Sequence, residues 1–148
     1  NAIASDTFRY LKIPEAEVNC DADKPVLRPV WWSEIPPAAL PGEKLDSKAM
    51  YSLVGLNETD AYAEFRAISG RIDATFFQIY SELKTAGYEP DCDPQSAPLE
   101  GPCFFWKAES DNIGVMVLTE QEVNDSKLVA PDGPVPSGMS LIVFYYWP

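Results

Sequence analysis

The chain has 148 residues and a net charge of −12, from 11 basic and 23 acidic residues, and it contains no histidine. The missing histidine excludes Ser-His and Cys-His nucleophile pairs and His-ligated metal sites, and the acidic balance excludes the basic surface of a nucleic-acid-binding protein. A hydrophobic content of 46% predicts one folded domain over residues 1–148, and the longest apolar run, Leu141–Trp147, falls short of the ~20 residues that cross a membrane.

The first third of the chain is predicted to be largely irregular. Asn1-Ala2 is interpreted as the remnant of a cleaved expression tag, and residues 8–13 have the alternation of a short strand. Residues 19–45 contain five prolines, and proline removes a donor from a sheet and disfavours helix at the preceding residue. We therefore expect a proline-rich arm, in which the adjacent Trp31 and Trp32 either clamp the segment onto the core or line a ligand groove.

The middle of the chain contains the clearest element, a helix from about residue 71 to residue 86. Its apolar residues recur at spacings of three and four, which places them on one stripe, and Gly87 then ends the helix. Residues 49–56 and 61–68 are predicted as strands, although a helix capped by Asp60 is an alternative for the second. The stripe consists of Ile72, Phe76, Ile79, Tyr80 and Leu83.

Three strands are predicted after the helix, at residues 103–109, 113–120 and 139–147. Residues 110–112 suit a hairpin turn between the first two, and residues 121–138 form a long connection. The strands are apolar on both faces, whereas a sheet with one covered face would alternate with polar residues. Because the helix covers only one face, we expect the Trp31-Trp32 segment, or a partner subunit of a homodimer, to cover the other.

These elements predict an α+β fold, with one main helix at about 71–86 packed on an antiparallel sheet of four or five strands and a proline-rich irregular arm at about 19–45. The chain contains no Gly-rich phosphate loop and no nucleophile motif. We therefore predict no cofactor and no catalytic residue.

The three cysteines, Cys20, Cys92 and Cys103, bear on the compartment in which the protein works. Ten residues separate Cys92 from Cys103, a spacing that fits no zinc or redox motif, so a disulfide across this loop is the favoured interpretation. Such a disulfide stabilises a fold by roughly 3 kcal/mol and indicates an oxidising compartment. All three pairings are open from the sequence, and three reduced cysteines in a cytosolic protein are the alternative.

Two acidic pairs are candidates for a cation site. Asp21 with Asp23, and Asp91 with Asp93, each place two carboxylates two residues apart, as calcium loops do. The third oxygen ligand, the turn glycine and the distal glutamate of an EF-hand are missing, so solvated loop acids are the favoured interpretation. Metal binding stays open, because a disulfide from Cys20 to either other cysteine would bring more of these acids together.

Large aromatic side chains are the candidates for a ligand or partner surface. They are rigid and partly polar, so they suit carbohydrate stacking or a protein interface. Packing of a central strand is the favoured interpretation for Trp106, Tyr145 and Tyr146. The candidates are Trp31, Trp32, Trp106, Tyr145 and Tyr146.

A further pattern extends from about Ile72 to Tyr146. Its residues are Tyr80, Leu83, Gly87 and Tyr88 at the helix end, Phe105 and Lys107 in the next strand, and Val115 and Val117 in the one after, before a last hydrophobic strand. This pattern resembles small exported bacterial proteins and lipoproteins of uncharacterised function. The resemblance implies an exported domain and supplies no functional residues.

The sequence therefore predicts a non-catalytic exported domain, periplasmic, secreted or lipid-anchored, that binds a protein partner or a small ligand with its tryptophans and tyrosines. One alternative is a cytosolic acidic inhibitor or immunity-type protein that binds a basic partner. The other is a hydrolase that uses carboxylates alone.

Overall fold

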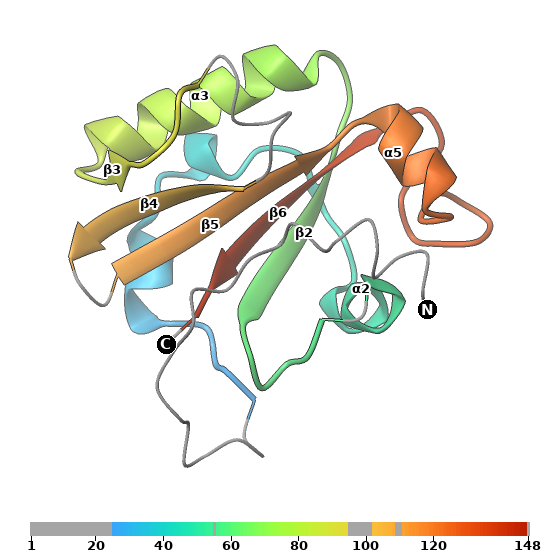
Figure 1. Cartoon of the computed structure of the whole chain (residues 1–148), viewed down its shortest axis with the longest axis horizontal. Helices are drawn as coiled ribbons and strands as arrows, with labels where there is room; N and C mark the ends of the chain where they lie inside the picture. Colours follow the sequence, from blue (N-terminus) through green and yellow to red (C-terminus); the bar gives the residue numbers. More distant parts are fainter. Residues whose placement is uncertain (1–24, 55, 95–101, 109–110, 148) are drawn as a thin grey trace.

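The computed structural model describes residues 25–54, 56–94, 102–108 and 111–147. These residues form one antiparallel sheet of six strands in the order β1-β2-β6-β5-β4-β3, with three α-helices and two 3-10 helices around it (Figure 1). The strands are β1 Glu43–Lys44, β2 Tyr62–Ile68, β3 Glu89–Pro90, β4 Cys103–Ala108, β5 Asp111–Leu118 and β6 Ser140–Tyr146. The helices are η2 Val30–Glu34, η3 Pro37–Ala39, α2 Ser47–Val54, α3 Ile72–Thr85 and α5 Glu120–Asp125.

The predicted α+β class and the main helix are confirmed. α3 buries Phe76, Ile79 and Leu83 of its apolar stripe, and Gly87 after it has a φ of 101°, a left-handed conformation that glycine tolerates best. β2, β4, β5 and β6 begin and end within two residues of predicted strands. The sheet has six strands instead of four or five, because β1 and β3 are two-residue edge strands that are too short to show an alternation. The strand predicted at residues 8–13 lies outside the described residues.

The strand predicted over residues 49–56 is wrong, because most of this segment is the helix α2. The Asp46 carboxylate accepts two backbone N–H groups of the first turn, at 3.0 and 3.3 Å, as an N-cap residue does. The buried residues Met50 and Tyr51 are adjacent in the sequence. A strand would point them to opposite faces, whereas one side of a helix can bring both onto the core.

A second short helix, α5, lies at the start of the segment that was predicted only as a long connection. Thr119 Oγ1 accepts the backbone N–H of Glu122 at 3.2 Å, and Glu122 Oε1 accepts the backbone N–H of Thr119 at 3.1 Å. This reciprocal pair is a capping box. The Thr119-x-x-Glu122 pattern is therefore the sequence signal for this helix, whose six residues are too few to show a helical period.

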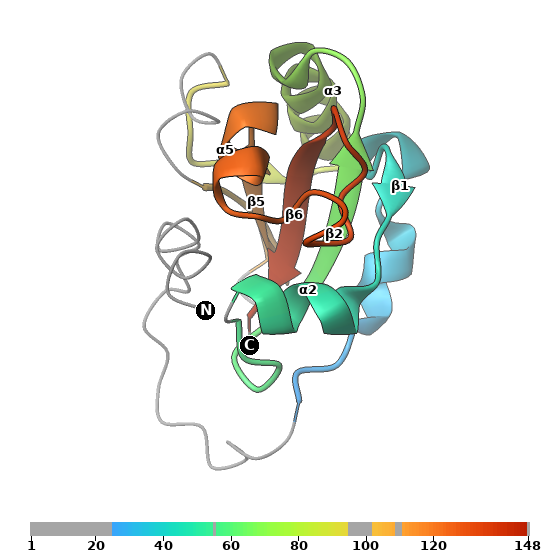
Figure 2. The same cartoon turned by 90° about the vertical axis from the view of Figure 1, so that its right-hand side faces the viewer.

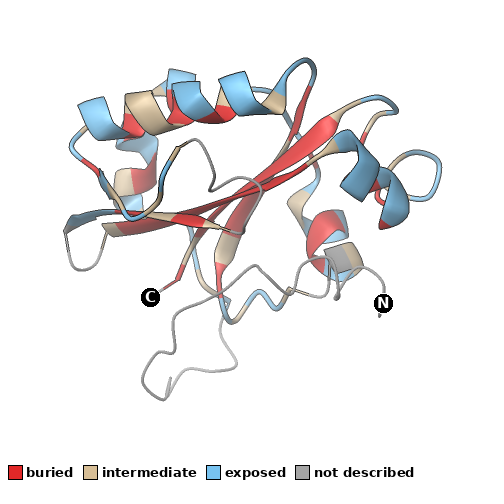
Figure 3. Cartoon of the chain, turned by 45° about the horizontal axis from the view of Figure 1, so that its top comes forward, coloured by how far each residue is buried: buried red, intermediate tan, exposed pale blue. Residues whose placement is uncertain are grey.

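The two faces of the sheet are covered by different parts of the chain. The described part of the arm, residues 25–45, packs on the same face as α3, where Trp32 and Ile35 join the apolar stripe of the helix. α2, α5 and the connection after α5 cover the other face through Met50, Val123 and Leu128. Figure 2 shows α5 and the arm on opposite sides of β6, and Figure 3 shows β2, β5 and β6 largely buried.

The expectation that both faces are covered is therefore confirmed for the described sheet. The expectation that the Trp31-Trp32 segment or a partner subunit covers the face opposite the helix is wrong. Two short helices, neither of which was recognised in the sequence, cover that face instead. The arm lies beside α3 instead, where Gln78 Nε2 donates to the carbonyl of Ala38 at 3.0 Å.

Gly114 on β5 has no side chain, and the Tyr145 ring of β6 occupies the space that a side chain would take. A Cβ atom at this position would lie 2.2 Å from Tyr145 Cζ, and the ring is buried in contact with Phe104 and Trp147. We expect Gly114→Ala to lower the free energy of unfolding by about 2 kcal/mol, measured by urea denaturation. An unchanged denaturation midpoint would contradict this close fit.

Candidate functional site

Aromatic side chains gather at the end of the sheet where β6 ends and β5 begins. Tyr146 and Trp147 lie on opposite faces. On one face the Tyr146 ring meets Trp31 edge-on at 5.6 Å between ring centroids, and on the other face the Trp147 ring meets Trp106 edge-on at 5.6 Å. Tyr88 adjoins Trp31 and Phe104 adjoins Trp147. We call this row around the end of β6 the aromatic belt: Trp31, Tyr88, Phe104, Trp106, Tyr146 and Trp147.

The belt contains three of the five aromatic residues predicted as a ligand or partner surface. Trp31 and Tyr146 are half-buried, and Trp106 is 36% exposed. Trp32 and Tyr145 are buried, so for these two the structure supports packing in the core over a place on a ligand or partner surface. Each packs into the core because its neighbour in the chain takes the outer position. Two members of the belt, Tyr88 and Phe104, were not singled out as site residues in the sequence.

Carboxylates lie near the phenols of the belt. Burial, with smaller contributions from the Asp111 and Glu34 carboxylates, raises the pKa of Tyr88 to about 12. Burial and then Asp111 also raise the pKa of Tyr146. The Lys107 ammonium lies 5.5 Å from the centre of the Tyr88 ring, within the range of a cation–π contact. The phenols are therefore neutral donors at ordinary pH, next to groups that accept hydrogen bonds.

The protein is expected to lose stability as the pH rises above about 10, the ordinary pKa of tyrosine. Burial raises the pKa of Tyr51 to about 12, as for Tyr88, and raises the pKa of three others, namely Tyr62, Tyr145 and Tyr146. Above pH ~10 the unfolded chain loses phenolic protons that the folded chain retains, so the free energy of unfolding falls by up to about 1.4 kcal/mol per pH unit for each such tyrosine.

Phenolate absorbance and circular dichroism, followed together from neutral to alkaline pH, measure this loss. We expect both signals to change in one cooperative transition. If most phenolate absorbance appeared near pH ~10 while the circular dichroism stayed native, the burial of these tyrosines would be contradicted.

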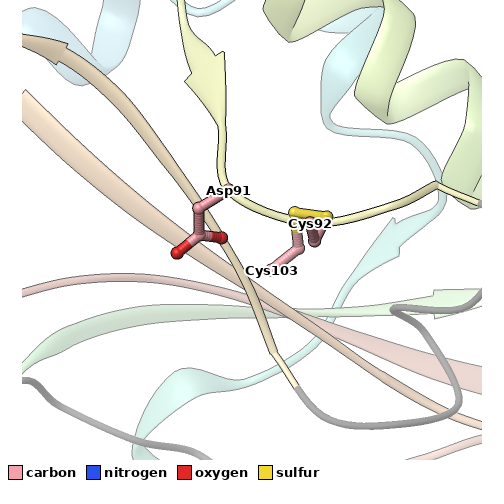
Figure 4. Close-up of side chains that lie close together, drawn as sticks. All are labelled: Asp91, Cys92 and Cys103. Carbon is pink, nitrogen blue, oxygen red and sulfur yellow. A yellow bond between two sulfur atoms is a disulfide. The ribbon is translucent and has the colours of Figure 1, made fainter.

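A disulfide joins the segment just after the edge strand β3 to the first residue of β4. The sulfur atoms of Cys92 and Cys103 lie 1.93 Å apart, and their Cα atoms 5.4 Å apart. Figure 4 shows the bond beside Asp91. The Asp91 N–H donates to the carbonyl of Phe104 at 3.0 Å, and the Phe104 N–H donates to Asp91 Oδ1 at 2.9 Å. Asp91 therefore extends the pairing of β3 with β4 and holds both cysteines in register.

The candidate cation-binding acids do not assemble within the described residues. Asp91 and Asp93 are exposed, and Asp91 Oδ1 already accepts a backbone hydrogen bond. The ligand atoms of Asp91, Cys92 and Cys103 lie within 4.8 Å of one another, but a disulfide offers no thiolate to a metal ion. The other candidates, Asp21 and Asp23, lie outside the described residues, as does Cys20.

A buried carboxylate that sequence analysis missed lies on β2. Glu64 is 3% exposed; it accepts a hydrogen bond from Tyr62 Oη at 2.7 Å and pairs with Arg66 Nη1 at 3.5 Å. Arg66 also donates from Nε to the carbonyl of Pro41 at 3.0 Å and from Nη2 to that of Gly42 at 3.4 Å. Glu64 is the one buried acid among the described residues.

This buried cluster ties the arm to the sheet. The Trp32 ring stands edge-on to Tyr62 at 5.2 Å, so the arm covers the strand on which the carboxylate lies. The carboxylate is engaged by a phenol and a guanidinium, and hydrolysis by paired carboxylates would need a second acid facing it. The contacts of Glu64 therefore favour a structural role over a catalytic one.

The described structure is an α+β domain with a disulfide at one edge of the sheet and an aromatic belt at one end. No model of a known protein family, no curated protein and no solved structure matches the chain. In the described part of the chain, no helix is long and apolar enough to cross a membrane. A functional assignment therefore depends on the side chains of this chain alone.

Proposed function

We propose that this protein is a non-catalytic binding domain of an oxidising compartment, periplasmic, secreted or lipid-anchored, whose protein partner or small ligand docks on the aromatic belt. One observation carries the proposal. Val30, next to Trp31, is 93% exposed, and Trp106 is 36% exposed. Rigid aromatic side chains with polar neighbours are enriched at the cores of interfaces, and a partner that removes the exposed surface of Val30 and Trp106 from water gains hydrophobic free energy.

The disulfide supports the compartment, because cytosolic reductants keep most thiols reduced. With Cys92 joined to Cys103, Cys20 is the remaining cysteine of the three. We expect one free thiol per chain when protein purified without reductant is denatured and titrated with a thiol reagent. Three free thiols would count against an oxidising compartment.

The binding surface is tested by photo-cross-linking the full chain in the cells that naturally produce it. We expect Trp31→Ala and Trp106→Ala to abolish cross-linked species that the unmodified chain forms. Phe77→Ala is the matched control, since Phe77 is an exposed aromatic residue on α3 and not part of the belt. If all variants gave the same species as the unmodified chain, the belt would not be the binding surface.

The charge of −12 favours one rival, a cytosolic acidic inhibitor of a basic partner. The exposed Glu120 and Glu122 lie in the first turn of α5, whose last turn contains no basic residue. Association steered by charge weakens steeply with added salt, whereas docking on the aromatic belt should respond little. Three free thiols together with strongly salt-dependent binding would support the rival over our proposal.

A further inference from the structure

A hollow of about 580 Å³ opens between α2 and the segment that precedes β2. Ser52 and Lys48 line it from α2, and Leu56 and Glu58 line it from the facing segment. The backbone N–H of Val26 in the arm donates to the carbonyl of Glu58 at 2.7 Å, so the arm helps to hold this wall. None of these residues belongs to the aromatic belt or to the Glu64 cluster.

Several polar groups of the hollow are already used to fix its walls. The Tyr51 hydroxyl donates to the carbonyl of Ala61 at 2.8 Å and accepts the N–H of Ala63, which ties α2 to β2. Asn57 Oδ1 accepts both the N–H and the hydroxyl of Thr59, at 2.9 and 2.8 Å. The Tyr51 bonds therefore fix α2 against β2, and the Asn57 bonds fix the turn within the facing wall.

The two charged groups of the hollow are the Lys48 ammonium and the Glu58 carboxylate. Within the described residues, the Lys48 ammonium and the Glu58 carboxylate form no ion pair; the two pairs present are Arg66 with Glu64 and Arg71 with Asp73. Among the described residues, the hollow therefore presents an exposed ammonium and an exposed carboxylate, neither of which has an ion-pair partner. The Tyr51 ring and Leu56 supply an apolar surface beside them.

We infer that this hollow binds a small zwitterion, an α-amino acid with an apolar side chain. Lys48 pairs with the ligand carboxylate, Glu58 pairs with the ligand ammonium, and the apolar side chain lies against Leu56 and the Tyr51 ring. A ligand with both charges satisfies both groups at once, whereas a ligand with one charge leaves the other group unpaired. The inference does not depend on the aromatic belt, so either can fail while the other holds.

The test uses L-leucine, N-acetyl-L-leucine and L-leucinamide as probes, added to the full chain while backbone amide resonances are recorded by NMR. We expect L-leucine to shift the amides of Ser52, Leu56 and Thr59 saturably. Each probe that lacks one charge should bind at least about tenfold more weakly, since a hydrogen bond to a charged group contributes that much or more.

Matched variants assign the two charges. Lys48→Gln and Glu58→Gln should each weaken L-leucine binding by about tenfold or more, with thermal midpoints near that of the unmodified chain. Lys84→Gln, at the exposed end of α3, should leave binding unchanged. The inference is overturned if L-leucine gives no saturable shift up to roughly 10 mM, if N-acetyl-L-leucine binds equally well, or if both hollow variants bind like the control.

Discussion

Replacing Arg66 by methionine is expected to lower the free energy of unfolding by about 3 kcal/mol. The substitution removes the positive partner of the buried Glu64 carboxylate and leaves the carbonyls of Pro41 and Gly42 without their guanidinium donor. A buried charge that loses its partner is costly, because neither water nor an opposite charge compensates it. Urea denaturation of the variant and the unmodified chain at neutral pH measures the difference.

An exposed ion pair supplies the matched control. Arg71 Nη2 lies 2.6 Å from Asp73 Oδ2, and the two side chains are 80% and 65% exposed, so Arg71→Ala should change the free energy of unfolding by less than about 1 kcal/mol. The double variant Arg66→Met with Glu64→Leu should recover much of the loss, because it removes the unpaired charge. If the Arg66 and Arg71 substitutions lowered the free energy of unfolding equally, a stabilising role of the buried pair Glu64–Arg66 would be contradicted.

Replacing Cys92 and Cys103 together by alanine is expected to lower the free energy of unfolding by about 3 kcal/mol. The bond closes a loop between residues separated by 11 positions, and opening it gives the unfolded chain back the conformations that the closed loop denied it. Because β3 is only two residues long, we also expect the residues around Asp91 to exchange their amide hydrogens faster. Denaturation and hydrogen exchange measure the two effects.

The reductant dithiothreitol separates the disulfide from the packing of the two side chains. The unmodified chain should lose a similar stability in dithiothreitol, whereas the double alanine variant should not respond to it. A thiol reagent shows when all three cysteines are reduced. If the free energy of unfolding of the unmodified chain were unchanged under those conditions, the disulfide would not stabilise the fold.

The parts of the fold that could be predicted from the sequence are those with a long local period. α3 has an apolar stripe over about three turns, and β2, β4, β5 and β6 are long enough to show their apolar faces. The prediction failed at α2, where eight residues are too few to separate a helical period from an alternation. At α5 the capping box was present in the sequence, but six residues gave no period to support it.

The candidate site could be predicted only in part, for a similar reason. Trp31, Trp106 and Tyr146 were recognised as large aromatic residues, but composition does not say which side of a strand reaches solvent. Tyr145 points into the core because Gly114 on the neighbouring strand leaves room for its ring. Trp32 is buried because the arm turns it towards Tyr62 and α3.

The chain's own residues thus specified the α+β class, the main helix, the absence of histidine chemistry and the spacing that suits a disulfide. The folded molecule specified where the arm lies, which aromatics form the belt and that Glu64 is buried. These last features depend on contacts between distant segments, such as Arg66 with Pro41, 25 residues apart, and Asn112 with Trp147, 35 residues apart. Local periodicity depends only on residues that are close in the sequence, so it cannot indicate such contacts. Packing in three dimensions decides which distant segments meet.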